Sequence, residues 1–162
     1  MIILGVDPGS RRTGYGVIET DGRRHQLVQH GVIAPPPRAT LPEKLRRVHD
    51  GIREIIAAYS PDVLAVEDVF HAVNTRTALV LGHVRGVVLL AGAHAGLAVY
   101  AYPPATVKLQ ITGFGRAEKQ QVASMVARLL ELTGEAPTGD AADALAVALC
   151  GAHLGTTEGI PT

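Results

Sequence analysis

The chain has 162 residues, 47% hydrophobic and 19% charged, which is enough apolar material for one well-formed core. Its 15 basic and 15 acidic side chains cancel, so no overall field draws it to nucleic acid or to an anionic membrane, and any polyanion site must be local. The single cysteine, Cys150, excludes an intrachain disulfide and fits a reducing cytosol. The opening MIILGVD carries no basic leader, and the apolar stretch 80–97 is interrupted by His and Arg. We therefore expect a cytoplasmic protein that does not associate with membranes.

The first 33 residues predict three strands in an antiparallel meander. The β-branched run 2–6 reads as a buried strand that ends at Asp7, with Pro8 and Gly9 as a turn. Residues 13–20 and 25–33 flank the turn signal Asp21-Gly22 and predict a hairpin.

The remainder predicts helices that alternate with strands. Apolar residues at steps of three and four indicate an amphipathic helix, and the short run VLAV ends, like the first strand, in acid. A helical crossover makes the later strands parallel to the first, which gives a five-stranded mixed sheet, three antiparallel strands and then two parallel ones, flanked by helices. We expect one α/β domain over 1–155 and a short disordered tail over 156–162. The expected later elements are helices at 41–59, 75–95, 116–132 and 140–153 and strands at 63–66 and 97–101.

Three segments carry carboxylates that this topology directs to one place. Asp7 and Glu67 end strands that we expect to be adjacent and parallel, and ligands of open α/β sheets gather at the carboxyl ends of strands. Asp140 and Asp143 share one face if they are helical, and the many alanines of DAADALAVA let that helix lie close to the sheet. Asp68 should point to the opposite face from Glu67.

Each acid also has an ordinary structural explanation. Asp7 suits a turn before Pro-Gly, while Asp140 suits a helix N-cap with Asp143 favouring the helix dipole. Glu67 is harder to explain in this way, because a carboxylate at the end of an apolar strand is rarely buried without a partner.

Clustered carboxylates need a compensating cation. All-oxygen ligands suit Mg²⁺ or Mn²⁺, and two such ions would activate water and stabilise the leaving oxygen in phosphodiester hydrolysis. Gly9, Gly14 and Gly16 would then leave room beside Asp7 for an anionic backbone and its metals, although ordinary turn and bulge positions explain them equally well. The chain has no GxxxxGK phosphate loop, no G-x-S-x-G and no HExxH, so other chemistries fit less well.

The motifs together resemble the RuvC family of bacterial Holliday junction resolvases. The matching stretches are ILGVDPGSRRTGYGVI, AVEDVF, LGHVRGV, GRAEKQQV and DAADALAVA, in the order and spacing of that family and over nearly the whole chain. The resemblance implies a ribonuclease H-like fold, a homodimer, and magnesium-dependent paired nicking of four-way junction DNA in recombination and repair, which leaves 5′-phosphate and 3′-hydroxyl ends. It assigns the catalytic and metal-binding roles to Asp7, Glu67, Asp140 and Asp143, the same four acids.

The resemblance also implies DNA contacts and partners. Phe70 corresponds to an aromatic that stacks on an unpaired base at the junction centre, and Lys108 and Lys119 to lysines near the scissile phosphate. Asn74 and Arg76 are candidate phosphate contacts, and the family suggests contact with a branch-migration helicase complex. Two alternatives stay open at this stage: a YqgF-like nuclease that acts on RNA, and a junction-binding protein without catalysis.

Overall fold

A computed structural model shows one twisted sheet with helices on both faces, and it describes residues 1–68, 74–133, 137–155 and 160–161. The strand order is β3-β2-β1-β4-β5-β6. β1 is antiparallel to β2, β2 to β3, and β1 is parallel to β4, as β4 is to β5, so the predicted mixed sheet is confirmed. The strands are β1 (Ile2–Asp7), β2 (Thr13–Thr20), β3 (His25–Ile33), β4 (Val63–Glu67), β5 (Ala98–Tyr102) and β6 (Ile160–Pro161).

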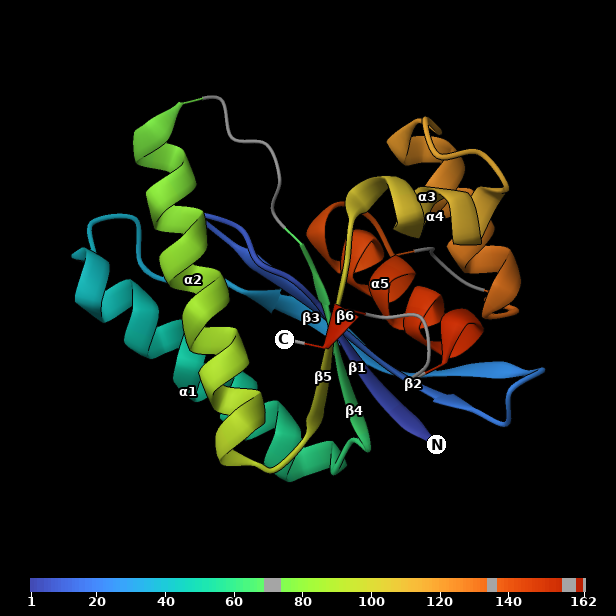
Figure 1. Cartoon of the computed structure of the whole chain (residues 1–162), viewed down its shortest axis with the longest axis horizontal. Helices are drawn as coiled ribbons and strands as arrows, with labels where there is room; N and C mark the ends of the chain where they lie inside the picture. Colours follow the sequence, from blue (N-terminus) through green and yellow to red (C-terminus); the bar gives the residue numbers. More distant parts are fainter. Residues whose placement is uncertain (69–73, 134–136, 156–159, 162) are drawn as a thin grey trace.

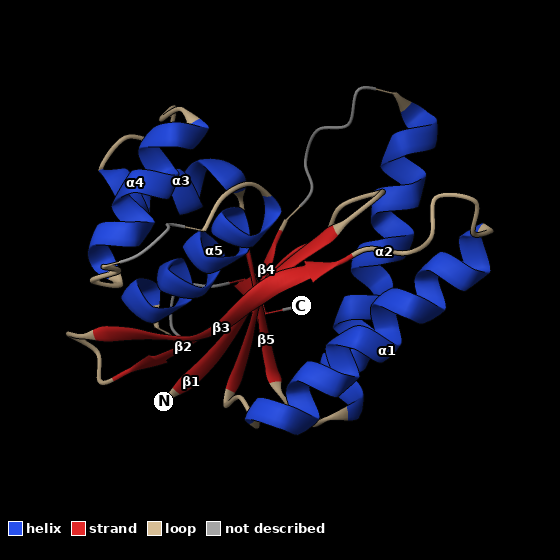
Figure 2. Cartoon of the chain, turned by 180° about the vertical axis from the view of Figure 1, so that it is seen from behind, coloured by secondary structure: helices blue, strands red, loops and turns tan. Residues whose placement is uncertain are grey.

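The helices form two layers. Figures 1 and 2 show α1 and α2 on one side of the sheet and α3, α4 and α5 on the other. α1 and α2 pack on each other and cover one buried apolar cluster, whereas α5 lies across β1 and β2 and covers a second. The helices are α1 (Leu41–Tyr59), α2 (Thr75–His94), α3 (Pro104–Thr112), α4 (Lys119–Leu129) and α5 (Asp140–Leu154).

Strand alternation decides which face each strand-end acid joins. In β1, Ile3 belongs to the cluster under α5, whereas Leu4 and Val6 belong to the cluster under α1 and α2. Successive side chains point to opposite faces, so Asp7 shares the α5 face with Ile3. By the same alternation in β4, Glu67 lies on the α5 face.

Glycines let α5 approach the sheet. A β-carbon at Gly5 would overlap the carbonyl oxygen of Ala144, one at Gly14 would overlap that of Asp140, and one at Gly16 would lie 2.6 Å from Leu145 Cδ2. Because these contacts are with helix backbone or core, side chains there would push α5 off the sheet. The expectation that Gly14 and Gly16 leave room for a bound anion is therefore wrong: the space is filled by α5.

Gly9 serves the turn after β1. A β-carbon there would overlap the carbonyl oxygen of Arg12, so this glycine allows the chain to fold tightly back into β2. It, too, makes room for the protein's own backbone.

Two elements differ from the expectations. The sequence predicts no helix between the strand at 97–101 and the helix at 116–132, yet Pro104 begins α3. Proline is well suited to the first turn of a helix, where its missing N–H has no intrahelical partner. The sheet also gains β6, whose two residues pair with β5; the rest of the 156–162 tail lies outside the described residues.

α2 has an open side. Within the described part of the chain it is the helix long and apolar enough to cross a membrane by length and composition, and only 22% of that stretch is buried. Its buried residues are Val84, Val88, Ala91 and Gly92, which face the sheet. Leu79 and Leu90 remain 60% and 47% exposed.

We expect Gly5→Ala to destabilise the fold by about 3 kcal/mol, because the added methyl group meets the backbone of α5. Val28→Ala is the control, because it shortens a side chain on β3 that is 41% exposed. Urea unfolding followed by circular dichroism measures both. Equal stability of the two variants would contradict the close packing of α5.

Candidate active site

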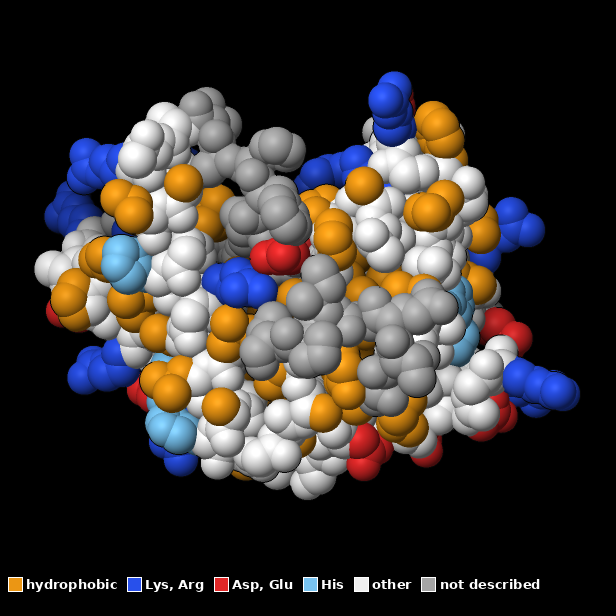
Figure 3. All heavy atoms as spheres, in the orientation of Figure 1, with side chains coloured by type: hydrophobic (Ala, Val, Ile, Leu, Met, Phe, Trp, Pro, Cys, Tyr) orange, Lys and Arg blue, Asp and Glu red, His pale blue; other side chains and the backbone are white. Residues whose placement is uncertain are grey.

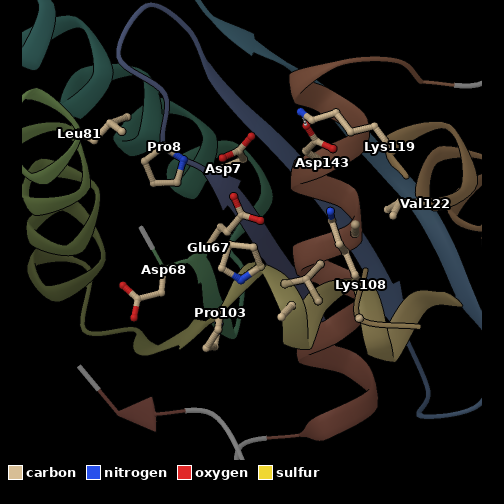
Figure 4. Close-up of a pocket in the computed structure, with 15 residues that line it drawn as sticks. Asp7, Pro8, Glu67, Asp68, Leu81, Pro103, Lys108, Lys119, Val122 and Asp143 are labelled. Carbon is tan, nitrogen blue, oxygen red and sulfur yellow. Dashed lines mark hydrogen bonds and ion pairs between the residues drawn. The ribbon is translucent and has the colours of Figure 1, made fainter. Parts of the chain in front are cut away.

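Asp7 and Glu67 lie side by side at the carboxyl ends of β1 and β4. The parallel register pairs Val6 with Val66, so the acids that follow are neighbours on the same face. Their carboxyl groups share a hydrogen bond, and Figure 4 shows the two side chains turned toward one another. Strand order and register alone are sufficient to create this pair.

The first turn of α5 supplies the other two acids. Gly139, with φ of 59°, is the N-cap, and Asp140 is the first helical residue, so the N-cap explanation for Asp140 is wrong. Asp143 follows one turn later on the same face and lines the cleft with Asp7 and Glu67. Asp140 is held instead by Arg12, whose Nε lies 3.1 Å from Asp140 Oδ2.

These acids open into a cleft of about 730 Å³ between the sheet and the α2, α3 and α4 helices. Two lysines project into it: Lys108 from α3 and Lys119 from α4. Apolar side chains, including Val107 and Val122, form much of the remaining wall. The cleft therefore places carboxylates at its base and ammonium groups beside them, an arrangement suited to a phosphate held next to cations.

The pKa values of Asp7 and Glu67 lie well above the usual range of carboxyl groups. Burial raises the pKa of Asp7 to about 6, and the charge of Asp143 adds to this effect. Burial raises the pKa of Glu67 to about 8, with the charge of Asp7 as the next cause. Both shifts have one physical cause, because two carboxyl groups so close together and so buried are costly to ionise at the same time. The pair thus shares a proton where a cation would otherwise be needed.

Lys119 neutralises the third acid of the cleft. Its Nζ donates to Asp143 Oδ2 at 2.7 Å, and this hydrogen bond raises the pKa of Lys119. Glu118, the residue before it, is the N-cap of α4. Its backbone N–H donates to Gln121 Oε1 at 2.9 Å. The capped helix start holds Lys119 at the edge of the acid cluster.

The acids fit a divalent cation by their chemistry. Asp7, Glu67 and Asp143 offer only carboxylate oxygens, the ligands that Mg²⁺ and Mn²⁺ prefer, and Asp143 is near enough to raise the pKa of the other two. In the described residues, no three acid, His or Cys side chains already surround one point. Asp143 forms an ion pair with Lys119, and Asp140 forms one with Arg12. Metal binding would require both carboxylates to leave these partners.

Asp68 has a separate structural role. Figure 4 shows it turned away from Asp7 and Glu67, as strand alternation predicts. Its Oδ1 lies 3.3 Å from the Nε of Arg85 on α2. This partly buried ion pair ties the end of β4 to α2, a connection that sequence analysis did not foresee.

The remaining candidate residues lie on or before α2. Asn74 is the N-cap, and its Oδ1 accepts a hydrogen bond from the Thr77 N–H at 3.0 Å. Arg76 is exposed on the first turn. Phe70 lies outside the described residues. Their DNA contacts stay predictions.

The arrangement defines a class of protein. A sheet of three antiparallel and two parallel strands, with acids at the ends of its first and fourth strands and at the start of the last helix, is that of a ribonuclease H-like nuclease. The chain belongs to the RuvC family: the model described as Crossover junction endodeoxyribonuclease RuvC matches residues 3–151.

Individual relatives agree over nearly full length. The chain is 46% identical over 159 residues to RuvC of Desulforamulus reducens, which covers 98% of each chain. It is 52% identical over 151 residues to RuvC of Halorhodospira halophila, covering 93% of this chain and 89% of the relative. The structure of Thermus thermophilus RuvC in complex with Holliday junction substrate matches with a TM-score of 0.91 at 36% identity, over 100% of this chain and 99% of that one. The resemblance and the ribonuclease H-like fold are both confirmed.

We expect stability without divalent ions to fall as pH rises. The folded pKa values of Asp7 and Glu67, about 6 and 8, exceed the ordinary 3.8 and 4.5, so the folded state binds protons more tightly than the unfolded chain. Their contribution is full below about pH 4 and is lost as pH rises to about 8. Glu67→Gln should remove most of the slope above about pH 6 and raise the unfolding free energy at pH 8 by about 1–2 kcal/mol.

Urea unfolding in EDTA over this pH range measures the effect. Asp50→Asn, a change on the exposed side of α1, should keep the wild-type slope. An unchanged slope in Glu67→Gln would show that the pair does not share a proton.

Proposed function

We propose that this chain resolves Holliday junctions by metal-dependent hydrolysis of two opposed DNA strands. The observation that carries the proposal is the cleft in which Asp7, Glu67 and Asp143 converge beside Lys108 and Lys119. Membership of a family of crossover junction endodeoxyribonucleases supports the reaction. The likeness to an RuvC structure that holds a Holliday junction substrate supports the choice of DNA.

The acids would hold two Mg²⁺ ions, with Mn²⁺ as a substitute. Asp7, Glu67 and Asp143 are the ligands in the cleft, and Asp140 joins them when it leaves Arg12. Such ions, when bound, activate water and stabilise the leaving 3′-oxygen, so that cleavage leaves 5′-phosphate and 3′-hydroxyl ends. Asp7 and Glu67 would release their shared proton on holding a cation, because a nearby positive charge favours both ionised carboxylates.

The basic side chains orient the strand. Lys108 faces the cleft from α3 and would contact the scissile phosphate. Lys119 would exchange Asp143 for a phosphate oxygen, which frees that carboxylate as the DNA arrives. Arg12 would do the same for Asp140, since its side chain is 61% exposed. In this way substrate binding and completion of the acid cluster would be linked.

Further DNA contacts would come from the start of α2. Arg76 is exposed there and would bind phosphate, and Asn74, whose side-chain oxygen caps the helix, would place its amide nitrogen near the same strand. Phe70 would stack on an unpaired base at the junction centre, a contact worth about 1–3 kcal/mol.

The open face of α2 supports a homodimer. Leu79, Gly82, Gly86 and Leu90 recur at steps of three and four on its exposed side, and β-carbons at both glycines would meet nothing within 4 Å. Figure 3 shows hydrophobic side chains gathered over this part of the molecule. Packing against a second α2 would cover them, and a two-fold dimer presents two equivalent clefts to a two-fold junction. We place this dimer in the cytoplasm, in recombination and repair, with a branch-migration helicase complex as a further partner.

Cleavage of a synthetic four-way junction tests the function. With Mg²⁺ or Mn²⁺ the wild type should make paired symmetric nicks, and EDTA should abolish them. Asp7→Asn should lower the rate by about a thousandfold, because it removes a metal ligand that supplies several kcal/mol to the transition state. Asp50→Asn is the control and should cut normally.

Three outcomes would contradict the proposal. Cleavage of an RNA hairpin in place of the junction would favour a YqgF-like activity. Junction binding without cleavage under either metal would indicate a protein that only binds junctions. Full activity of Asp7→Asn would remove the acid pair from the mechanism.

The dimer is tested by light scattering coupled to gel filtration. Leu79→Glu and Leu90→Glu should each shift the protein from about twice the chain mass to the monomer mass, because a charge would be buried in the interface. Val28→Glu places the same charge on β3, at a side chain 41% exposed, and should stay dimeric. Monomeric wild type would refute the interface.

A further inference from the structure

Phe114 and Leu109 form an exposed ridge beside the cleft. Phe114 is 59% exposed and Leu109 is 50% exposed. Two large apolar side chains exposed side by side mark an interaction site more often than an ordinary surface. Phe114 is also one of only two phenylalanines in the sequence. Phe114 and Leu109 line a hollow of about 510 Å³ together with Arg116. Phe114 also lines a second hollow, together with Gln121 and Met125 of α4.

The backbone of Phe114 is fixed. Gly113, with φ of 76°, ends α3 and turns the chain outward. The Phe114 N–H donates to Thr112 Oγ1 at 3.2 Å, and the Phe114 carbonyl accepts the Ala117 N–H at 3.0 Å. A ring held on such a turn is presented at the surface and costs little further ordering when it binds a partner.

The hollow continues into the catalytic cleft. Ala105 and Gly115 line both, so the ridge begins where the cleft ends. The surrounding surface is basic although the whole chain is neutral: residues 103–130 contain one acid, Glu118, and the cations Lys108, Arg116, Lys119 and Arg128. Figure 3 shows basic and hydrophobic side chains next to one another over α3 and α4.

We propose that this ridge binds an unstacked nucleotide of the strand that leaves the cleft, with Phe114 stacked on its base and Arg116 on its phosphate. The proposal rests on the proposed function, since it assumes that DNA occupies the cleft. An aromatic face accepts any base and a guanidinium accepts any phosphate, so the contact holds and positions the cleaved strand without reading its sequence. The basic surroundings and the shared wall favour a nucleic-acid strand over an apolar protein segment.

Fluorescence of 2-aminopurine tests the contact directly. Junctions carry the probe one to four nucleotides from the cut, and Asp7→Asn keeps them intact. We expect this protein to change the fluorescence at one or two of these positions, and the double variant with Phe114→Ala to lose that change. The double variant with Phe114→Trp should restore it.

Kinetics separates stacking from a merely apolar contact. In otherwise wild-type protein, Phe114→Ala should raise KM for the junction about five- to hundredfold with kcat within about twofold. Phe114→Trp should keep the wild-type KM, whereas Phe114→Leu should behave like the alanine variant. Arg116→Gln should reduce the salt dependence of binding by about one phosphate contact. Val28→Ala is the exposed apolar control, and thermal melting confirms that each variant folds.

An unchanged KM and unchanged fluorescence in Phe114→Ala would overturn this inference while junction cleavage by the wild type upheld the proposed function. A fully active Phe114→Leu would also overturn it, because leucine cannot stack. Failure of the wild type to bind the junction at all would overturn both.

Discussion

The close contact of α5 with β1 and β2 is the constraint on which the site depends. Gly5, Gly14 and Gly16 carry no side chain at the points where α5 comes closest to these strands. The alanine-rich face of α5 meets them, and residues 144–150 are fully or almost fully buried there. Because Asp143 lies on the first turn of the same helix, any increase in this spacing would move it away from Asp7. Packing density here is therefore also active-site geometry.

The negative charge of the acid cluster is balanced by groups that metal ions and DNA would replace. A shared proton and the ammonium group of Lys119 balance the charges of Asp7, Glu67 and Asp143 in the cleft. These are local and replaceable counter-charges. Divalent ions and a phosphodiester would replace them together, since the ions favour the ionised acids and the phosphate competes for the lysine.

The two layers of helices divide the work. The α1–α2 layer carries the exposed apolar face of α2, on which we propose the dimer, and the Asp68–Arg85 pair ties that layer to the end of β4. The α3–α5 layer carries the acids, the lysines and the exposed ridge of Phe114. The basic side chains of α3 and α4 lie beside the acidic cleft. A chain of zero net charge can therefore attract a polyanion locally, at the surface where these side chains gather.

The sequence by itself determined the order of strands and most helices, because apolar periodicity and turn residues act over a few neighbouring positions. It also predicted that Asp7 and Glu67 approach each other if the first and fourth strands are parallel neighbours, and the register of β1 and β4 fulfils that condition. It missed α3, where Pro104 reads equally as a stop or a start, and it left open whether Gly14 and Gly16 make room for a ligand.

Only the tertiary structure decided what fills the space beside those glycines, that Arg12 holds Asp140, and that Asp68 binds Arg85. These outcomes depend on distances between segments far apart in the chain. Periodicity along one segment carries no information about such distances.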